Sequence, residues 1–540
     1  MTMTDSLGGL DITSLDRYLA HGYPWQAWDV LRDEAPVYRY ERPGYPPFWA
    51  VTRYDDVRTV HAHRDVFING GAILRIDTVE GIAAIDRFKQ RQAERFGYSP
   101  DAPLDMIYLD KSEHFDLRML TMRQFTPAAM RRLEVHLGDL AKRFVAEFVA
   151  RAKAANGEPI DLVANLSVGV PLATICGLID VPEDDWQRIL AWTDAMLFPG
   201  VAAENVKPGE TGRDVRRRLG LEYRAYREEL IADRRERGPA GDDLVTSLVF
   251  ATIDGEPLDD QQLHGYLELL IAAGNETTRN AISGGVKVLL ENPGEGDRLA
   301  ADPDGLMETA VEEILRWTSP VIQFARTATR DFELNGVTIK ESDTVVLWYP
   351  SANRDERQFP EPYRLDVGRQ PNIHLAFGYG PHFCLGANLA RWELRAVFRE
   401  LAPHLHNLEL AGEPRRVPNL HVGAIGELPV RWVDLPPRLA PAARLRSRRV
   451  LGVGPSCSQP GRQSAVNGQV DTVDPPATPD RQPADGFRLI HRLRRAADLL
   501  AEPRHLFWSC VGLEKREQRR DHRARAHAID PDPRAHKPTG

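Results

Sequence analysis

One helical pattern, unbroken from Asp260 to the residue before Pro293, constrains the fold more than any other part of the sequence. Its length of about 32 residues predicts a helix of roughly 48 Å at 1.5 Å per residue. A helix this long has to pass through the middle of its domain. Its central segment, residues 267–278, is apolar and then abruptly polar, with Glu276 beside Thr277. These residues predict either an acid and a hydroxyl hidden from water or, equally, a Thr277 that bonds back to a carbonyl with Glu276 at the surface.

The other periodic segments predict a mainly helical chain with a minor sheet component. Residues 47–53 and 344–348 have strand patterns, and residues 331–339 predict a hairpin that turns at Asn335-Gly336. A helix is expected from residue 54, behind a cap region at Asp55 and Asp56. Residues 70–109 form a long connection with a basic helical insert near residues 84–95, which is typical of a lid or binding loop.

The composition excludes several classes of protein. Of the 540 residues, 42% are hydrophobic and 27% are charged, so the chain can bury a large core. Its net charge of −9 argues against a nucleic-acid-binding protein, which needs a basic face. No C-x-x-C pair occurs, which argues against a zinc ribbon or disulfide scaffold and suits a reducing cytoplasm. The four cysteines are Cys176, Cys384, Cys457 and Cys510.

The sequence predicts neither secretion nor a membrane span. Residues 1–10 lack the basic and apolar regions of a signal peptide. The longest apolar stretch, residues 162–179, is interrupted by Asn165, Ser167 and Pro171, whereas a transmembrane helix needs about 20 cleaner residues. We expect a buried core helix in this stretch.

The charge changes sign along the chain and divides it into two parts. Residues 435–540 carry 20 Lys and Arg against 11 Asp and Glu, and hold 13 of the 40 prolines. We therefore expect one folded domain over residues 1–434 and an Arg- and Pro-rich, disordered tail over residues 435–540. Such a tail is an interaction arm or, as we expect, an appendage without a role in catalysis, and GC-rich DNA translated past a stop codon could produce it.

A single cysteine, Cys384, lies in a glycine-rich loop directly before a helical run over residues 387–398. Glycines at 378, 380 and 386 permit close backbone approach and positive φ. The N-terminus of the following helix favours a thiolate over a thiol. A lone cysteine is ordinarily a small buried hydrophobe, but this setting predicts a ligand.

The loop sequence Phe377-x-x-Gly380-x-x-x-Cys384-x-Gly386 resembles the haem-binding signature of the cytochromes P450. Residues 273–278 resemble the family's oxygen-activation motif on its long central helix, residues 313–316 its E-x-x-R pair, and residues 359–369 the loop whose arginine completes that pair. The resemblance covers essentially residues 10–434. It implies a mainly α fold with small β-sheets, in which haem lies between the central helix and the cysteine loop.

The resemblance also implies which residues hold the cofactor, haem b. Cys384 is expected to bind the iron. The residues expected around the haem and its propionates are Phe377, Gly378, His114, Arg118, Arg326 and His382. A charged network expected to hold the haem loop, outside the chemistry, consists of Glu313, Arg316 and Arg369. The chain departs from the family where Lys111-Ser112 replaces Pro-Pro and where Glu361 and Leu365 replace the commoner Asp and Phe.

The implied activity is that of a haem-thiolate monooxygenase, an oxidoreductase that reduces O2 with two electrons and hydroxylates its substrate. Glu276 and Thr277 are the expected catalytic residues, which organise water and deliver protons. The substrate contacts carried over are Ala273, Gly274, Val321, Phe324 and Ile425. Because these regions are mostly apolar, we expect a hydrophobic small molecule. Residues 273–280 are similar to those of bacterial members that hydroxylate steroids, branched lipids and terpenoids.

Three alternatives remain beside this hypothesis. The first is a tailoring oxygenase of a polyketide or other secondary metabolite. The second is a haem-thiolate peroxygenase or isomerase, which would need no reductase, although such enzymes often lack the pair formed here by Glu276 and Thr277. The third is a non-catalytic haem binder or sensor, which NAD(P)H consumption would distinguish.

The electrons are expected to come from other proteins. The sequence holds no P-loop, no G-x-G-x-x-G after a strand and no ferredoxin-like cysteine pattern. A ferredoxin and its NAD(P)H-dependent reductase are therefore the expected partners, and Arg118 and Arg123 are candidate docking residues. We expect a cytoplasmic monomer without a transmembrane segment that binds no nucleic acid.

Overall fold

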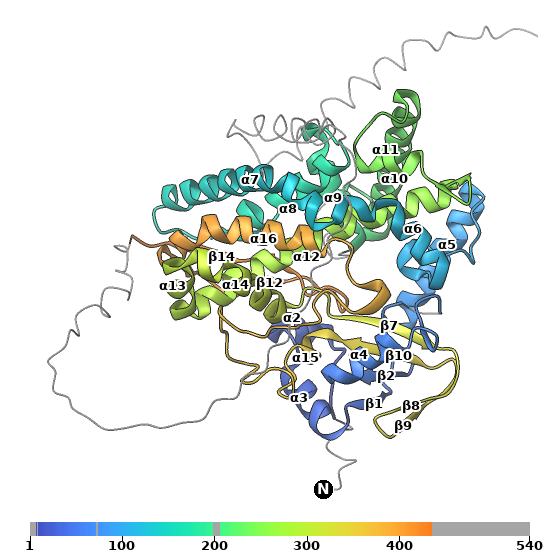
Figure 1. The fold of residues 1–540 in the computed structure, drawn as a ribbon, viewed down its shortest axis with the longest axis horizontal. Coiled ribbons are helices and arrows are strands. Elements are labelled where there is room, and N and C mark those ends of the chain that lie inside the picture. Colours follow the sequence, from blue (N-terminus) through green and yellow to red (C-terminus); the bar gives the residue numbers. More distant parts are fainter. Residues whose placement is uncertain (1–6, 8, 72–73, 198–205, 435–540) are drawn as a thin grey trace, which may run out of the picture.

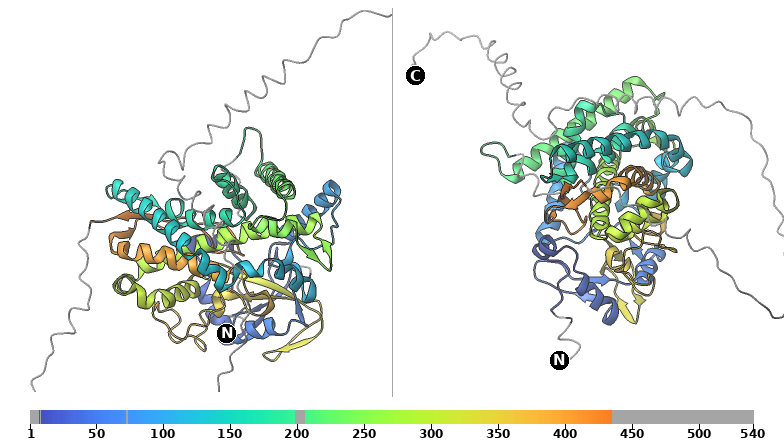
Figure 2. Two further views of the ribbon diagram at one scale, coloured as in Figure 1. Left: turned by 45° about the horizontal axis from the view of Figure 1, so that its top comes forward. Right: turned by 90° about the vertical axis from the view of Figure 1, so that its left-hand side faces the viewer.

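The computed structural model describes residues 7, 9–71, 74–197 and 206–434, and the expected tail lies outside these residues. A helix-rich part and a sheet-rich part lie side by side, and the N-terminal segment belongs to the sheet-rich part (Figures 1 and 2). The expectation of a mainly helical chain with small sheets is confirmed.

Helices account for the larger share of the fold. The α-helices are α2 (Leu15–His21), α3 (Trp25–Glu34), α4 (Tyr54–Ala62), α5 (Val79–Phe96), α6 (Lys111–Met122), α7 (Pro127–Ala154), α8 (Gly169–Leu178), α9 (Trp186–Leu197), α10 (Gly212–Arg237), α11 (Leu244–Val249), α12 (Asp260–Glu291), α13 (Pro293–Ala301), α14 (Pro303–Thr318), α15 (Tyr349–Ala352) and α16 (Ala387–Leu401). Short 3-10 turns occupy Met106–Tyr108, Arg123–Phe125, Glu183–Asp185, Gly380–His382 and Ala402–Asn407, and a π-helical turn occupies Val163–Ser167.

The central helix α12 has the predicted length and the predicted ends. At its start, the Asp259 carboxylate accepts from the Gln262 N–H at 2.7 Å, and the Gln262 side chain accepts from the Asp259 N–H at 3.1 Å. This capping box satisfies amide groups that the first turn of a helix leaves without partners. The helix ends at Glu291, and Pro293 begins α13. Helix α12 packs against α8, α14 and α16, so it does cross the middle of the domain.

A five-stranded sheet forms most of the remaining structure, with the strand order β1-β2-β10-β7-β3. Strands β2 and β10 are parallel, and the other neighbours in this sheet are antiparallel. Its strands are β1 (Val37–Tyr40), β2 (Phe48–Val51), β3 (Phe67–Ile68), β7 (Gln323–Ala328) and β10 (Thr344–Trp348). The smaller sheets contain β4 (Ile160–Asp161), β5 (Thr252–Ile253), β6 (Glu256–Pro257), β8 (Phe332–Leu334), β9 (Val337–Ile339), β11 (Leu408–Leu410), β12 (Arg415–Arg416), β13 (Ile425–Glu427) and β14 (Pro429–Trp432).

Two local predictions near the sheet have different outcomes. The hairpin β8–β9 turns at Asn335 and Gly336, which both have positive φ (53° and 76°), as a two-residue I′ turn requires. The predicted cap of α4 is wrong. Asp55 and Asp56 lie inside the first turn, the N-cap is Arg53, and the Tyr54 N–H donates to the Asp355 carboxylate at 2.9 Å. A residue 301 positions away supplied the cap, which local sequence does not reveal.

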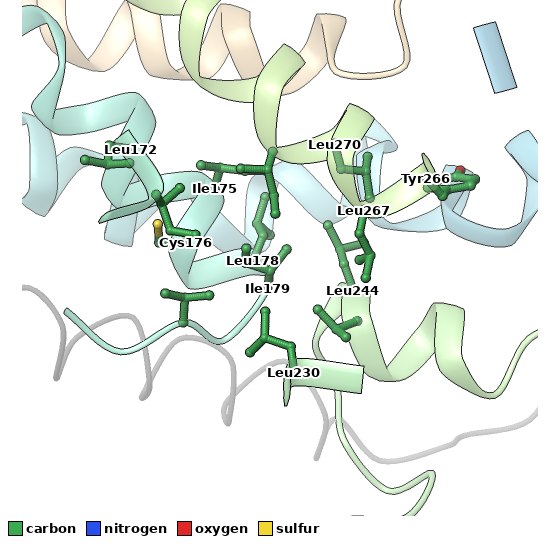
Figure 3. Packing of buried hydrophobic residues seen from close by; sticks show 14 of the residues in the cluster. Leu172, Ile175, Cys176, Leu178, Ile179, Leu230, Leu244, Tyr266, Leu267 and Leu270 are labelled. Carbon is green, nitrogen blue, oxygen red and sulfur yellow. The ribbon is translucent and has the colours of Figure 1, made fainter. Parts of the chain in front are cut away.

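One of two large apolar cores of the described helical part lies between α8 and α12, and the other joins α7, α12, α14 and α16. All residues of α8 from Val170 to Leu178 are buried, and Figure 3 shows Ile175, Leu178 and Ile179 facing side chains of α10, α11 and α12. The apolar stretch 162–179 is therefore a core segment, as predicted. Among the described helices, none is both long and apolar enough to cross a bilayer.

Candidate active site

The Cys384 loop holds its shape through backbone hydrogen bonds. The Cys384 N–H donates to the Phe377 carbonyl at 3.0 Å, and the Gly378 N–H donates to the Leu375 carbonyl at 2.9 Å. Gly378 and Gly380 have φ of 71° and 72°, which L-residues rarely adopt. A Cβ on Gly380 would also lie 3.2 Å from the His61 carbonyl oxygen. The loop then enters α16 at Ala387, so the thiol lies just before a helix N-terminus, as predicted.

The acidity of the Cys384 thiol differs from our expectation. Cys384 is a free cysteine with an accessible side chain. The surrounding protein nevertheless displaces enough water to raise the pKa of its thiol, although the Gly386 N–H, Arg118 and Arg391 act in the opposite direction. The Gly386 N–H at the start of the helix thus acts in the predicted direction, but the loss of water outweighs it. A bound metal ion deprotonates a thiol that coordinates it, so a ligand role needs no prior ionisation.

A cavity of about 430 Å³ is lined by the four basic residues that the resemblance assigned to haem propionates. Arg326 on β7 is buried, and its Nη1 donates to the Ala325 carbonyl at 2.7 Å. Arg118 on α6 donates to the Phe383 carbonyl at 2.6 Å. The rings of His114 and His382 lie 3.9 Å apart. Arg118 and Arg326 form no ion pair with any carboxylate in the described ranges 9–71, 74–197 and 206–434.

The pKa values around this cavity indicate a site for an anion. Burial, together with Arg118, lowers the pKa of His114 to about 4. Burial, His114 and Arg326 lower the pKa of His382 to about 2. Burial also lowers the pKa of Arg326. The two histidines are thus neutral near pH 7, and the buried positive charge belongs to Arg118 and Arg326. A buried cation is stabilised by a negatively charged ligand, so the carboxylates of haem fit these residues.

The sequence analysis missed His61 on α4, which also lines this cavity. Its Nε2 lies 3.1 Å from the Tyr349 hydroxyl, and burial and the Arg326 charge hold the pKa of His61 well below its usual value. Position 61 lies on an amphipathic helix at an ordinary core position, so nothing in its local sequence distinguishes it.

The predicted network of Glu313, Arg316 and Arg369 is present as geometry. Arg316 donates to both carboxylate oxygens of Glu313 at 2.8 Å, and Arg369 Nε lies 3.2 Å from both. Glu313 and Arg316 have no exposed side-chain surface. Arg316 also donates to the Asn353 carbonyl at 2.8 Å, and the Asn353 side chain accepts from the Leu375 N–H at 2.7 Å. The network thus reaches the start of the cysteine loop.

A second ion-pair network beside the loop was not predicted. Glu312 accepts from Arg391 Nε at 2.7 Å and Nη2 at 2.8 Å, and His374 Nε2 lies 3.1 Å from it. Burial raises the pKa of Glu312, but these hydrogen bonds outweigh it and lower the pKa to about 2. The Arg391 guanidinium lies 4.5 Å from the centre of the Phe377 ring. Glu312 precedes the recognised Glu313, and this adjacency is the only sequence signal that we find.

The departure at Lys111 has a local structural consequence. Lys111 is the first residue of α6 and has a φ of 52°, which a proline could not adopt. The preceding Asp110 carboxylate accepts from the N–H groups of Asn69 and Gly70 at 3.0 and 2.7 Å. The chain around His114 is therefore held by Asp110 in a path that the family's Pro-Pro would not follow.

A second cavity, of about 290 Å³, runs along α12. Nine residues of α12 line it, from Gln261 to Thr277, at alternating spacings of three and one. This spacing places them on one face of a helix. Ala273, Val321 and Phe324 line it as the resemblance implied, and so do Glu276 and Thr277.

Glu276 is buried, with 1% of its surface exposed, and it lies between charged groups. Arg279 donates to one Glu276 oxygen and, at 3.0 Å, to Asp194 of α9. Burial raises the pKa of Glu276 well above its usual value, which Arg279 opposes and Asp194 reinforces. The Thr277 hydroxyl donates to the Ala273 carbonyl at 2.9 Å. Glu276 is therefore hidden from water, as the first alternative predicted, and Thr277 bonds back to a carbonyl, as the second alternative predicted.

The structure places two of the expected substrate contacts elsewhere. A Cβ on Gly274 would lie 3.0 Å from the Ile175 side chain, so this glycine faces α8. Ile425 lies on β13, where its N–H donates to the Asn280 side chain at 3.1 Å and its side chain packs against the core. Neither lines the cavity along α12, whereas Ala272, His421 and Val422 do. Ala273 and Gly274 are adjacent in sequence but point to different sides of α12. The resemblance alone did not show which of the two faces the cavity.

Comparisons with known proteins identify the family. The cytochrome P450 family profile matches residues 81–418. The methyl-branched lipid omega-hydroxylase of Mycobacterium tuberculosis is 40% identical over 433 residues, which are 79% of this chain and 94% of that protein. The steroid C26-monooxygenase of Rhodococcus jostii is 34% identical over 439 residues, or 78% and 85% of the two chains.

Solved structures agree with the sequence comparisons. A cytochrome P450 of Mycobacterium marinum in complex with pseudoionone has a TM-score of 0.68 and 34% identity, and the match covers 78% of this chain and 98% of that one. Since the profile spans more than half of the chain and the relatives exceed 30% identity over most of it, this chain belongs to the cytochrome P450 family.

Proposed function

We propose that this cytochrome P450 hydroxylates a slender, hydrophobic small molecule of the lipid, steroid or terpenoid type, which lies in the cavity along α12 beside Thr277. Members of the family are haem-thiolate monooxygenases, so the chain is an oxidoreductase that uses haem b and O2. The observation that carries the proposed substrate class is the cavity itself. It combines an acid and a hydroxyl, Glu276 and Thr277, with the apolar walls of Leu269, Val321 and Phe324.

The residues of the cysteine loop and of the 430 Å³ cavity fit haem b. Cys384 would bind the iron, and Phe377 and Gly378 belong to the same loop. The propionates would be bound by Arg118, Arg326, His114 and His382. Neither arginine has a carboxylate partner among the described residues. When bound, the haem supplies reductive activation of O2 and transfer of one oxygen atom to the substrate.

Glu276 and Thr277 are proposed to supply protons to the reacting oxygen. Burial raises the pKa of Glu276 well above its usual value, although Arg279 opposes the shift, so this carboxyl holds a proton more readily than an exposed glutamate does. Arg279 and Asp194 fix its position. The Thr277 hydroxyl donates to the Ala273 carbonyl and therefore presents its lone pairs to the cavity, where it can accept a hydrogen bond from water. A positioned acid and a water-binding hydroxyl are the parts that a proton path needs.

The relatives support a lipid-like substrate over the alternative of polyketide tailoring. One relative acts on methyl-branched lipids and another on steroids, and a neighbouring structure holds pseudoionone, all at 34–40% identity. A P450 of the bacillaene polyketide synthase and one bound to erythromycin B are also similar, at 29% and 28% identity. A cavity of about 290 Å³ is at the small end of the range for ligand sites, which suits a chain better than a macrocycle. The buried Glu276 beside Thr277 also favours a reductase-dependent enzyme over a peroxygenase.

The electron donors are proposed to be a ferredoxin and its NAD(P)H-dependent reductase. Arg118 lies close enough to Cys384 for its charge to affect the pKa of the thiol, and Arg123 follows α6 directly. We further propose that the enzyme acts as a monomer in the cytoplasm, where the free thiols of Cys176 and Cys384 stay reduced.

The CO difference spectrum of the dithionite-reduced protein tests the proposal first. We expect the long-wavelength Soret band of thiolate-ligated haem in the wild-type protein and its loss in Cys384→Ser. Cys176→Ser is the matched control, because this thiol is buried in the core at α8. A histidine-type band in the wild-type protein would contradict the ligand assignment.

Turnover with surrogate ferredoxin and reductase tests the substrate class. We expect NAD(P)H-dependent hydroxylation of a branched fatty acid, a sterol or an acyclic terpenoid. No product from any of these three classes, together with an intact thiolate spectrum, would contradict the proposed substrate while leaving the family assignment in place.

A further inference from the structure

We propose that the end of the α12 cavity farthest from Thr277 is a binding site for the carboxylate of a long-chain substrate, with Arg224 as its anchor. This inference rests on the proposed function, because it places the opposite, apolar end of the same substrate at Thr277. The site is formed by the C-terminal half of α5 with Tyr98, by the middle of α10 and by the first turns of α12.

The length of the cavity separates its two polar ends. His264 and Thr277 both line it and are 13 positions apart on α12, which corresponds to roughly 20 Å. The α12 residues between them that line the cavity are Gly265, Glu268, Leu269, Ala272, Ala273 and Glu276. At Gly265 a Cβ would lie 2.1 Å from the Leu104 carbonyl oxygen, so loop 99–105 closes tightly over the helix at this end.

Arg224 is held rigidly at the far end. Its guanidinium lies 3.6 Å from the centre of the Phe96 ring and 4.9 Å from that of Tyr98. Its Nε donates to Glu228 at 2.8 Å, and no other carboxylate of the described chain pairs with it. Arg224 also shares a hydrogen bond with the Tyr98 hydroxyl, and both residues line this end of the cavity. A fixed guanidinium binds a carboxylate through two parallel hydrogen bonds.

Three further lining residues have buried polar atoms without a hydrogen-bond partner among the described residues. They are Gln92 Oε1, Arg227 Nε and His264 Nδ1. Arg227 and His264 are more than nine-tenths buried. A buried polar atom without a partner is costly, and most such atoms are paired. Their convergence on one end of one cavity indicates a polar ligand.

The charge at this end favours an anion. Arg224, Arg227 and Lys89 line it, against Glu268 and Asp105. Glu268 is already engaged by Arg227 Nη1 at 2.7 Å. Burial raises the pKa of Asp105 to about 7, so this carboxyl is only partly ionised at neutral pH. Arg224 shares its charge with the half-exposed Glu228, so the charge of Lys89 and part of that of Arg224 remain for a ligand.

The test compares two probes of equal chain length, palmitic acid and methyl palmitate, by isothermal titration of the haem-loaded protein. We expect the acid to bind the wild-type protein at least about tenfold more tightly than the ester. Arg224→Gln should weaken binding of the acid by about tenfold and change binding of the ester less than about twofold. The matched control is Arg216→Gln, which removes an exposed arginine of the same helix.

The outcomes separate this inference from the proposed function. Equal affinity for acid and ester, or an Arg224→Gln variant that weakens both alike, would overturn the carboxylate site alone. Failure of both probes to bind the wild-type protein would overturn the lipid substrate class as well. If Arg224→Gln does not fold, Arg224→Lys replaces it. This variant keeps the positive charge but loses the paired donors of the guanidinium, so it should still weaken binding of the acid more than binding of the ester. Tyr98→Phe provides an independent perturbation of the same site.

Discussion

Two glutamates within this domain, the partly buried Glu312 and the buried Glu393, differ widely in pKa, and the difference follows from their partners. Glu312 accepts from Arg391 and His374, and these hydrogen bonds outweigh burial and lower its pKa to about 2. For Glu393 on α16, burial outweighs the hydrogen bonds with the hydroxyls of Thr174 and Thr278 and raises the pKa to about 8. At neutral pH the first is a charged link near the cysteine loop, and the second is predominantly a neutral acid in the core.

Glu393 makes the stability of the domain depend on pH. In the unfolded chain its carboxyl has the ordinary pKa of 4.5, whereas burial in the folded state raises the pKa to about 8, so the folded protein keeps the proton up to about pH 8. The unfolded state thus binds fewer protons in this interval, and stability falls as the pH rises. Glu393→Gln, which cannot ionise, should gain about 3 kcal/mol over the wild type between about pH 5 and about pH 8.

Urea unfolding at several pH values measures this difference. Glu400→Gln, on the same helix but partly exposed, is the control and should not reproduce the trend. A constant difference in unfolding free energy between Glu393→Gln and the wild type across the interval would show that Glu393 does not carry the pH dependence.

Thr277 provides a second prediction, on the efficiency of turnover. Removing its hydroxyl takes away a hydrogen-bonding group between the Ala273 carbonyl and the cavity. Thr277→Ala should therefore reduce the product formed per NAD(P)H consumed by at least about tenfold, while NAD(P)H consumption continues. Thr277→Ser keeps the hydroxyl and should keep most of the yield. Equal yields from the alanine variant and the wild type would exclude Thr277 from the proton path.

Residues within recognisable motifs could be predicted, and residues that reach the site through the fold could not. The spacing around Cys384 was sufficient to assign the loop, and the pair Glu313 and Arg316 was visible as an i, i+3 spacing. Arg224 and His61 were not visible, because they come from α10 and α4 at positions that look like ordinary helix faces. Only the packing of these helices brings them to a cavity.

At the scale of elements, long periodic segments were predicted well and local ends less well. The bounds of α12 and β10 agree with the sequence patterns because the apolar period and the terminating Pro293 act within the segment itself. The cap of α4 and the orientation of Gly274 depend on distant residues, Asp355 and Ile175. Such dependence on tertiary contacts has no local signature.

Two helix glycines give a matched prediction about packing. At Gly265 of α12 an added Cβ would lie 2.1 Å from the Leu104 carbonyl oxygen, whereas at Gly138 of α7 it would meet no atom of the described residues within 4 Å beyond the adjacent turns of its own helix. Gly265→Ala should lower the free energy of unfolding by roughly 1–3 kcal/mol, because backbone has to move. Gly138→Ala should raise it by up to about 1 kcal/mol, because alanine is the better helix former. Urea unfolding distinguishes the two, and effects of the same sign would contradict this account of the contact.

At the scale of the molecule, the last described strand, β14, is hydrogen-bonded into a sheet of the domain before residue 435. Strand β14 pairs with both β11 and β4, and the Val433 N–H donates to the Asn407 carbonyl at 2.8 Å. The lipid hydroxylase of Mycobacterium tuberculosis is matched over 94% of its own length by only 79% of this chain. From these two observations we propose that residues 1–434 form one folding unit.

A chain that ends at Asp434 tests this division. Because Trp432 packs in the core and its Nε1 donates to Asp434 at 2.9 Å, the last contacts of β14 are retained in the shortened chain. We expect the same thiolate-type CO spectrum as the full chain and a melting temperature within about 2 °C of it. Ending the chain at Leu428 instead removes β14 from its sheet, and this variant should not fold. Loss of the spectrum in the chain that ends at Asp434 would mean that residues 435–540 contribute to the folded domain, contrary to the division inferred from charge and proline content.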